Sequence, residues 1–195
     1  MVQGTPGLEH RLAALLLRDE WFLSVLEHAR SLTLPDWVVG AGAIRSTVWD
    51  HLHELEERTP VKDVDLAYFD PIDVSLERDR ALETELRRQA PEIPWDVTNQ
   101  AGVHLWYEAR FGNPMSQPIA SIEDGISRWS ETAASVGVRL ASDDSIVVIA
   151  PCGLEDLFDM VFRRNPKQMS VETFRHRVAT KGIEETWPRV TIVAE

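Results

Sequence analysis

The order of apolar and polar residues along the chain predicts helices that alternate with short strands. Apolar positions over 7–30 recur at helical spacing and predict one helix or two short ones. The apolar run 37–39 then predicts a strand that ends in closely spaced glycines, and helical spacing follows over 41–57. A second apolar run, 62–70, predicts another strand. This strand, helix, strand order is the feature around which we interpret the rest of the chain.

The remaining segments extend the same alternation. Two apolar segments on either side of the polar turn 141–145 predict a β-hairpin. Apolar residues at helical or alternating spacing predict, in order, a charged helix over 74–89, a short strand over 93–98, and helices over 121–129, 154–162 and 171–185. We find no internal repeat and no flexible linker in the sequence.

Two acidic residues stand one residue apart in the second predicted strand. Side chains alternate between the faces of a strand, so Asp63 and Asp65 project from one face while Val64 and Leu66 point to the other. Two neighbouring negative charges on a largely buried strand are costly unless a positive charge lies between them. Because oxygen ligands suit Mg²⁺ or Mn²⁺, the pair predicts half of a divalent metal site.

The turn before the predicted helix 41–57 complements these acids. Its glycines allow backbone N–H groups and the N-terminus of the helix to approach a phosphate closely. Mg²⁺ in proteins commonly binds carboxylates and substrate phosphates together. The turn residues therefore predict the phosphate-binding part of a site for a nucleoside triphosphate (NTP); they are Gly40, Ala41, Gly42 and Ala43.

Several motifs of the chain resemble a known family. A glycine-rich turn that opens a helix, an Asp-x-Asp strand and a later acidic strand are similar to the nucleotidyltransferase superfold of polymerase beta. More narrowly, residues 37–188 resemble a bacterial family of small nucleotidyltransferase-like proteins, through Gly40-Ala41-Gly42-Ala43-Ile44-Arg45, Lys62-Asp63-Val64-Asp65-Leu66, Trp95-Asp96-Val97-Thr98-Asn99-Gln100-Ala101, His104-Leu105-Trp106-Tyr107 and Ala150-Pro151-Cys152-Gly153-Leu154-Glu155-Asp156-Leu157-Phe158. These motifs are specific for the fold and say little about the substrate.

The resemblance implies an α+β fold class, with a mixed β-sheet of about five strands flanked by helices. We expect a single nucleotidyltransferase-like domain over 1–195, with its catalytic core at about 36–100 and a helical and β-hairpin part at about 101–195. At 195 residues with 44% hydrophobic residues, the chain is long enough to bury one substantial core.

Charge and cysteine content narrow the classes of partner. The net charge of −12 and the pI of about 4.9 disfavour a broad nucleic-acid footprint, which needs Lys and Arg to neutralise phosphates. We therefore do not expect a long nucleic acid as a partner. The single cysteine, Cys152, excludes an internal disulfide. No apolar stretch is long enough to cross a bilayer, so we expect a cytoplasmic protein with no membrane partner.

Arg45 stands out in the first turn of the predicted helix 41–57. The positive end of a helix favours an acid over a base at this position. A bound triphosphate would explain the arginine, because its guanidinium group pairs with phosphate oxygens. Alternatively, Arg45 pairs with an acid such as Asp65 or faces solvent. The sequence favours neither interpretation.

At this turn the chain departs from the wider superfamily that it resembles. That superfamily usually opens the helix with a Gly-Ser pair whose hydroxyl contacts phosphate, whereas Gly42-Ala43 stands here. Backbone amides can still hold a phosphate. Ser46 lies one helical turn further on, and we include it among the candidate phosphate ligands.

The resemblance also implies a third carboxylate on a neighbouring strand, and Asp96 matches it. Its implied role is to bind the catalytic metal and to accept or orient the proton of an attacking hydroxyl. Taken alone, Asp96 can equally be a strand-end cap. Asp70, five residues beyond Asp65, is interpreted as a turn residue rather than a ligand.

Two further groups are candidates for ligand contacts. Asn99 and Gln100 follow the third acid and are predicted to hydrogen-bond a base or an acceptor, whereas His104 is interpreted as a core or boundary residue. A basic group in the C-terminal part is a candidate for the triphosphate or an anionic acceptor, although most surface cations are simply solvated; it comprises Arg163, Arg164, Lys167, Arg175 and Arg177.

Together these residues predict a metal-dependent nucleotidyltransferase. Mg²⁺ (or Mn²⁺) is expected to bind Asp63, Asp65 and Asp96, and an acceptor hydroxyl to attack the α-phosphorus of an NTP and release pyrophosphate. The expected acceptor is a small molecule or a protein hydroxyl. The alternative is a non-catalytic Mg-NTP-binding regulatory module, which the missing serine favours and the three acids disfavour.

Overall fold

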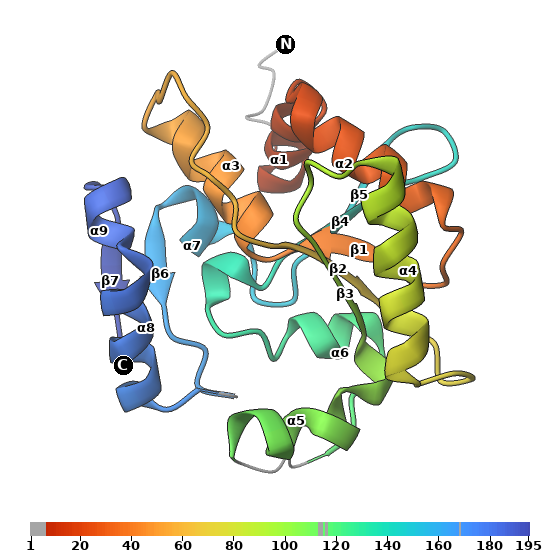
Figure 1. Cartoon of the computed structure of the whole chain (residues 1–195). Coiled ribbons are helices and arrows are strands. Elements are labelled where there is room, and N and C mark those ends of the chain that lie inside the picture. The colour runs from red at the N-terminus through yellow and green to blue at the C-terminus, as the bar shows by residue number, and fades with distance from the viewer. Residues whose placement is uncertain (1–6, 113–114, 116, 168) are drawn as a thin grey trace.

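A mixed five-stranded sheet forms the centre of the computed structural model, which describes residues 7–112, 115, 117–167 and 169–195 (Figure 1). Its strand order is β3-β2-β1-β4-β5, and only β2 and β3 run parallel. The strands are β1 (Val38–Gly40), β2 (Val64–Tyr68), β3 (Trp95–Asn99), β4 (Gly137–Leu140) and β5 (Ile146–Ile149). The predicted α+β class and the predicted hairpin, β4 with β5, are confirmed.

Helices surround this sheet, and a second sheet of two strands lies beside it. The helices are α1 (Leu8–Leu16), α2 (Glu20–Ser31), α3 (Gly42–Leu52), α4 (Leu76–Gln89), α5 (Val103–Phe111), α6 (Ile122–Ile126), α7 (Glu155–Phe158), α8 (Val171–Lys181) and α9 (Ile183–Thr186). The second sheet pairs β6 (Val161–Arg163) with β7 (Thr191–Val193). In Figure 1, α4 and the group of α8, α9 and β7 lie on opposite sides of the central sheet. Of the helices described, none combines the length and apolar character needed to cross a membrane.

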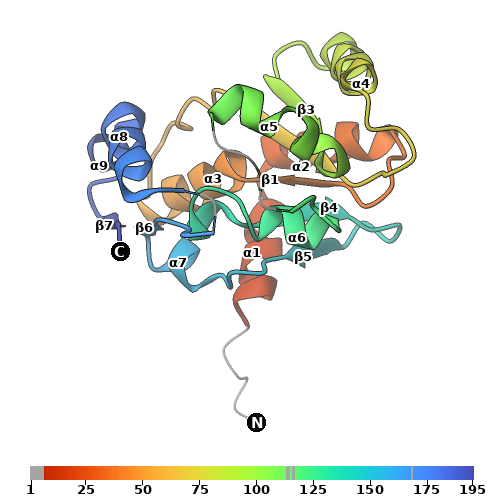
Figure 2. The ribbon, with the colours of Figure 1, turned by 90° about the horizontal axis from the view of Figure 1, so that it is seen from below.

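The alternation of side chains along β2 divides the core between the two faces of the sheet. Val64, Leu66 and Tyr68 are fully buried in the large cluster that includes residues of α1, α2 and α3. Ala67 points the other way, into a smaller cluster with Ile122 and other residues of α6. Asp65 shares the face of Ala67, as the period of two requires. Figure 2 shows α5 and α6 on the side of the sheet away from α1 and α2.

Helix α4 covers the open edge of β3. Asp79 accepts hydrogen bonds from the backbone N–H of Asn99 at 3.2 and 3.3 Å, and Glu83 accepts one from that of Val97 at 3.4 Å. Arg87 donates to the carbonyl oxygen of Trp95 at 3.3 Å. Backbone groups at an uncovered sheet edge invite pairing with another chain, and these side chains occupy them. The same contacts fix the position of β3 and therefore of Asp96.

The predicted helix 154–162 is wrong beyond Phe158. Met160 takes a positive φ of 55°, which a helix does not accommodate, and the chain then enters β6. Strand β6 pairs in parallel with β7, some thirty residues later, with Val161 opposite Thr191. Local periodicity carries no information about such a distant partner. Similarly, the predicted helix 171–185 is divided into α8 and α9 at Gly182, whose φ is 59°.

Candidate active site

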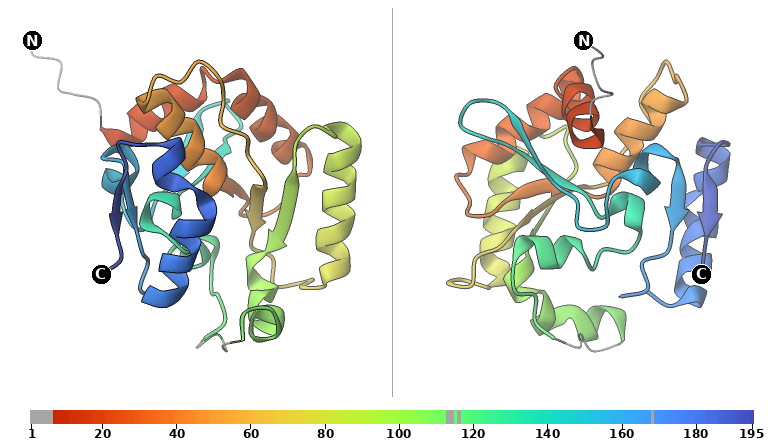
Figure 3. Two further views of the ribbon diagram at one scale, coloured as in Figure 1. Left: turned by 60° about the vertical axis from the view of Figure 1, so that its left-hand side comes forward. Right: turned by 180° about the vertical axis from the view of Figure 1, so that it is seen from behind.

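Two of the candidate metal ligands, on and beside β2, line a cleft of about 570 Å³. Asp63 and Asp65 line it from the sheet, Arg45 lines it from α3, and Arg177 and Lys181 line it from α8. In the left view of Figure 3, α8 lies to one side of β2 and β3 while α4 lies to the other. The cleft therefore places carboxylates and cations from distant parts of the sequence opposite one another.

The three predicted carboxylates lie in one row, which we call the acidic row: Asp63, Asp65 and Asp96. Asp65 pairs directly with Asp96 in the parallel register of β2 and β3, so both side chains project from the same face. Burial, followed by the charges of Asp63 and Asp96, raises the pKa of Asp65 to about 7. Lys181 and Arg177 lower the pKa of Asp65, but by less than burial and the two carboxylates raise it.

The acidic row is not a closed metal site. Among the described residues, no three His, Cys, Asp or Glu side chains are gathered closely enough to enclose a metal ion. The donor set nevertheless fits Mg²⁺, which commonly binds one or two carboxylates and completes its shell with water and substrate phosphates. Burial and, after it, repulsion by Asp63 and Asp96 raise the pKa of Asp65, and a bound cation would relieve both effects.

The turn between β1 and α3 presents only part of the predicted phosphate-binding segment to the cleft. Ala41 and Gly42 line it, and a Cβ atom on Gly42 would meet nothing within 4 Å. Gly40 instead packs beneath Trp129, because a Cβ atom there would lie 2.6 Å from the indole ring. The Ala43 side chain is fully buried in the core. Gly40 and Ala43 therefore shape the turn, while Ala41 and Gly42 face the cleft.

Ala41 itself has an unusual backbone conformation, with φ 54° and ψ −124°. This is a region that L-amino acids avoid and glycine enters freely. Such strain is commonly found at functional turns, where the surrounding structure enforces it. Here the Ala41 N–H donates to the carbonyl oxygen of Val136 on the approach to β4, at 3.2 Å.

Arg45 is buried in a cage of aromatic rings. Its guanidinium carbon lies 5.3, 5.4 and 5.5 Å from the ring centroids of Trp49, Phe162 and Trp187. The side chain is 4% exposed, and its Nε finds no hydrogen-bond partner among the described residues. Burial lowers the pKa of Arg45. The interpretation that Arg45 faces solvent is therefore excluded. Arg45 is a buried cation at the wall of the cleft, and its Nε has no partner among the residues described.

Glu131 holds the cations of this wall together. It is 1% exposed and forms an ion pair with Nε of Arg177. Its charge raises the pKa of Arg45 and of Lys181, whereas burial, the larger influence, lowers both. Arg45, Arg177 and Lys181 form what we call the cationic wall, and Glu131 is its internal counter-charge.

Two of the three cations of the wall, Arg45 and Arg177, were candidates from the sequence. Arg177 was among the predicted basic residues, but Lys181 and Glu131 were not. Thr173, Arg177 and Lys181 follow one another at i, i+4 and i+8, which places them on one face of α8. The spacing of these three residues in the sequence could have indicated a polar face on this helix. The burial of Glu131 had no local signal.

The other predicted basic residues have structural partners outside the cleft. Arg163 pairs with Asp156 at 2.8 Å, and Arg164 donates to the carbonyl oxygens of Ala194 and Met169. Lys167 donates to Oγ of Ser127 at 3.2 Å. Arg175 is exposed on α8 and does not line the cleft. Only Arg177 of this group reaches the site.

Asn99 and Gln100 also lie outside the cleft. The Asn99 amide donates to the carbonyl oxygens of Asp70 and Asp73 and accepts from the N–H of Asp70 and Ala101. It is 1% exposed, so it joins the end of β3 to the loop before α4. Gln100 is buried against Gly125. Ser46, one turn into α3, is likewise buried and absent from the lining of the cleft.

Asp70, interpreted as a turn residue, is confirmed as one. Its carboxylate accepts from the N–H of Ile72 at 2.9 Å and from Arg78 at 2.8 Å. These hydrogen bonds lower the pKa of Asp70.

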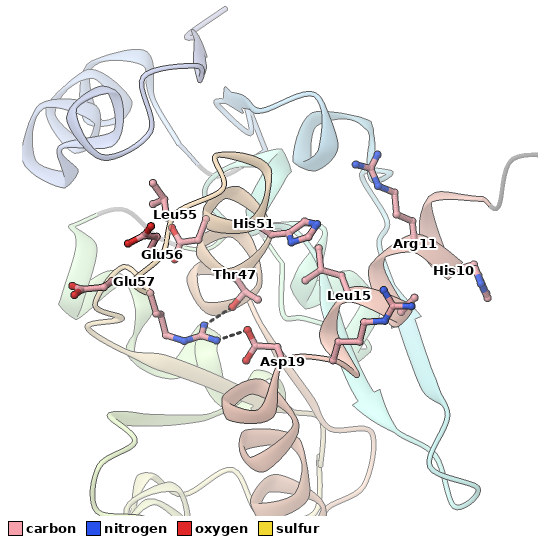
Figure 4. Close-up of a pocket in the computed structure, with 13 residues that line it drawn as sticks. His10, Arg11, Leu15, Asp19, Thr47, His51, Leu55, Glu56 and Glu57 are labelled. Carbon is pink, nitrogen blue, oxygen red and sulfur yellow. Dashed lines mark hydrogen bonds and ion pairs between the residues drawn. The ribbon is translucent and has the colours of Figure 1, made fainter.

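A larger cavity, of about 650 Å³, lies on the opposite face of the sheet among α1, α3 and the segment 55–58 (Figure 4). In it, Arg58 bridges Asp19 and the hydroxyl of Thr47. Its lining mixes acids and bases with aliphatic side chains and includes none of the acidic row. The chemistry predicted from the sequence therefore belongs to the smaller cleft.

Comparisons with known proteins agree with this fold. The sequence model of a nucleotidyltransferase family matches residues 27–192. A solved structure described as a CCA-adding enzyme head domain aligns with a TM-score of 0.75 and 25% identity, covering 94% of each chain. No curated protein matches the chain.

Two structures of CCA-adding enzyme, one with ATP and one with CTP, also align. Their TM-scores are 0.52 and 0.53, each at 14% identity over 93% of this chain. The chain spans about two fifths of those proteins, with 42% and 43% of their lengths covered. At this identity the likeness concerns the fold.

Proposed function

The chain belongs to the nucleotidyltransferase family, and we propose that it moves a nucleoside monophosphate from an NTP to an acceptor hydroxyl with the aid of a divalent metal ion. The observation that carries the proposal is that Asp63 and Asp65 of the acidic row face the cationic wall across one cleft. A metal–triphosphate complex carries both charges needed to complement the two sides.

The triphosphate is proposed to lie between the start of α3 and the cationic wall. Gly42 leaves open space at the N-terminus of an eleven-residue helix, where backbone N–H groups and the helix dipole favour an anion. Arg45, whose Nε has no hydrogen-bond partner within the described part of the chain, lines the same cleft. Arg177 and Lys181 face it from α8 and supply further positive charge. A phosphate chain therefore finds donors on two sides.

The acidic row is proposed to hold Mg²⁺ or Mn²⁺, with Asp63, Asp65 and Asp96 as the protein ligands. When bound, the metal would neutralise charge on the phosphates and make the acceptor hydroxyl more acidic. The row alone does not enclose an ion, so phosphate oxygens are expected to complete the ligand set. This arrangement makes metal binding depend on the NTP.

The protein's own groups then orient the reactants. Asp96 accepts the proton of the acceptor hydroxyl as its oxygen attacks the α-phosphorus in line. Arg45, Arg177 and Lys181 stabilise the negative charge that develops on the departing pyrophosphate. The helix N-terminus keeps the phosphates fixed during the displacement.

The acceptor is proposed to be a small molecule or a protein hydroxyl, given the net charge of −12. A second candidate is the 3′ hydroxyl of an RNA. It is favoured by one observation, namely that the structure matching over 94% of the chain is described as a CCA-adding enzyme head domain. ATP and CTP are the first nucleotides to test, since the CCA-adding enzymes of similar fold are complexed with them.

The experiment is to incubate the purified protein with each α-³²P-labelled NTP, Mg²⁺ or Mn²⁺, and either a metabolite extract or RNA. We expect labelled product and pyrophosphate with the native protein. Asp63→Asn and Asp65→Asn should form neither, whereas the matched control Asp144→Asn, at an exposed hairpin residue, should behave as the native protein.

The same experiment tests the alternative of a non-catalytic module. Mg²⁺-dependent NTP binding in a calorimeter, without any pyrophosphate release in the presence of extract and RNA, would favour that module. Absence of NTP binding would contradict both.

A further inference from the structure

The third acid of the row faces a different cavity from the other two. Asp63 and Asp65 line the cleft, but Asp96 lines a cavity of about 420 Å³ between α4, β3 and α5, which we call the α4–α5 cavity. Because β3 is the edge strand beyond β2, this cavity lies on the opposite side of the acidic row from α3. The row is therefore reached from two sides.

Helix α5 separates the two spaces. Its neighbouring residues Trp106 and Tyr107 diverge, so that Trp106 lines the α4–α5 cavity and Tyr107 lines the cleft. A molecule in one space can thus approach the acidic row without entering the other. This arrangement suits two reactants that reach the same row of carboxylates from different cavities.

The α4–α5 cavity offers a planar surface and apolar walls. Trp106 contributes an indole ring, and the guanidinium carbon of Arg110 lies 5.6 Å from its centroid. Leu76, Val97 and Ala109 supply further apolar lining. A volume of this size holds a small molecule, and aromatic side chains in such sites pack against planar rings.

The acids of this cavity other than Asp96 are already engaged. Asp79 accepts from the hydroxyl of Tyr68 at 2.7 Å and from the N–H of Asn99. Glu83 pairs with Arg87 at 2.6 Å. Asp96 accepts one long hydrogen bond, from the Thr98 hydroxyl at 3.4 Å, and is the carboxylate placed to receive a proton from a ligand in the cavity.

We propose that the α4–α5 cavity is the acceptor subsite, and that it takes a small alcohol with a planar ring, which packs against Trp106 while its hydroxyl reaches Asp96. The inference rests on the proposed function. In the transfer, the hydroxyl oxygen forms a bond to the α-phosphorus, and the bond between that phosphorus and its bridging oxygen to the β-phosphate breaks. The electron pair leaves with pyrophosphate, and the hydroxyl proton passes to Asp96 and then to water.

The test compares acceptors with and without a ring. Adenosine and benzyl alcohol serve as ring-bearing probes and glycerol as the ring-free probe, each with α-³²P-labelled ATP and CTP and Mg²⁺. We expect label transfer to the ring-bearing probes, and a KM for glycerol at least about tenfold higher, since stacking on an aromatic side chain commonly contributes that much.

Variants of α5 then locate the subsite. Trp106→Ala should raise the acceptor KM about tenfold and leave the KM for the NTP unchanged, and Trp106→Phe should restore most of the loss. The matched control is Leu105→Ala, at a neighbouring side chain that is 63% exposed and does not line the cavity. It should change neither constant, which separates loss of the ring from damage to the helix.

Three results would overturn the subsite: equal use of glycerol and adenosine, an acceptor KM insensitive to Trp106→Ala, or no labelled probe despite Mg²⁺-dependent NTP binding. Transfer to RNA that is indifferent to Trp106 would overturn it in favour of a polynucleotide acceptor. These results leave the proposed function standing. Failure to bind any Mg-NTP removes the proposed function, and the subsite with it.

Discussion

Asp63 and Asp65 of the acidic row face the same cleft as the cationic wall, but the two groups of side chains carry their charge in different ways. The row consists of carboxylates on and beside two adjacent strands, and burial, followed by the charges of Asp63 and Asp96, raises the pKa of Asp65 to about 7. The wall consists of cations from α3 and α8, and it contains its own counter-charge, Glu131, as well as the aromatic cage around Arg45. One side is incomplete without a ligand, while the other is largely stabilised by the protein.

This difference indicates how the site is built. Adjacent strands bring acids together at the cost of repulsion, which a metal ion relieves. Cations that come from distant segments need a counter-charge and packing contacts that fix their positions before the phosphates bind. In the protein without ligand, substitutions that remove charge from the acidic row should therefore stabilise the fold. Substitutions that disturb the cationic wall should destabilise it.

Substitution in the acidic row should have the largest effect. Asp65→Asn removes a charge that its neighbours oppose, so the metal-free variant should have a higher Tm than the native protein at pH 8. Its transfer activity should fall about 100-fold or more, because charge stabilisation at the reacting centre is lost. Differential scanning fluorimetry and the labelled-NTP assay measure the two effects.

Asp144→Asn is the matched control and should change neither the Tm nor the activity substantially. A lower Tm for Asp65→Asn, or full activity, would contradict the role given to the row.

The pH dependence follows from the same carboxyl group. Since the folded pKa of Asp65 is raised, the folded protein holds this proton between about pH 4 and 7 after the unfolded chain has lost it. Its contribution to stability is therefore present at low pH and lost as the pH rises toward 7. Metal binding must displace the proton, so Mn²⁺ affinity should rise about tenfold per pH unit up to pH 7 and then level off.

Titrating Mn²⁺ between pH 5.5 and 8 checks this slope in the presence of an NTP analogue. The slopes of stability against pH for the native protein and Asp65→Asn should differ between about pH 4 and 7 and be alike outside that range. A flat affinity profile for the native protein would mean that Asp65 does not bind the metal.

On the opposite side, Glu131→Gln should destabilise the ligand-free protein. The variant leaves three cations close together without their buried counter-charge, at a cost of about 1–3 kcal/mol in the free energy of unfolding. Pyrophosphate should restore more stability to this variant than to the native protein, because the anion replaces the missing charge. Urea unfolding with and without pyrophosphate measures both quantities.

Glu172→Gln, at an exposed acid in the first turn of α8, is the control and should show neither effect. If Glu131→Gln matches it, Glu131 does not hold the cationic wall.

A substitution in the turn between β1 and α3 should have the smallest effect. Ala41→Gly relieves a positive φ of 54° and should stabilise the protein by about 0.5–1 kcal/mol. The KM for the NTP should not change, because the backbone N–H groups stay in place. A lower urea midpoint than that of the native protein would show that Ala41 is not strained.

The same comparison shows what the sequence could predict. The shared face of Asp63 and Asp65 was predictable because strand periodicity is local. A short motif pointed to Asp96, and the register of β2 and β3 places it beside Asp65. Ala41 and Gly42 were predictable from a short motif as well, but no pattern indicated that Gly40 packs beneath Trp129.

The cationic wall depends on contacts between residues far apart in the chain. Arg45 is enclosed by Phe162 on β6 and by Trp187, and β6 itself exists only because β7 pairs with it. Asn99 shows the opposite error. An amide near a candidate catalytic acid suggested ligand recognition, yet its hydrogen bonds go to the loop before α4 and to the N–H of Ala101. Local patterns did not reveal which polar groups the fold already uses.

The most direct test of a metal site on the acidic row is a Mn²⁺ titration followed by electron paramagnetic resonance, with a non-hydrolysable ATP or CTP analogue present. We predict that the native protein and Asp144→Asn bind Mn²⁺ only with the analogue, and that Asp63→Asn, Asp65→Asn and Asp96→Asn each bind it far more weakly. Unchanged Mn²⁺ binding in all three variants would contradict the account.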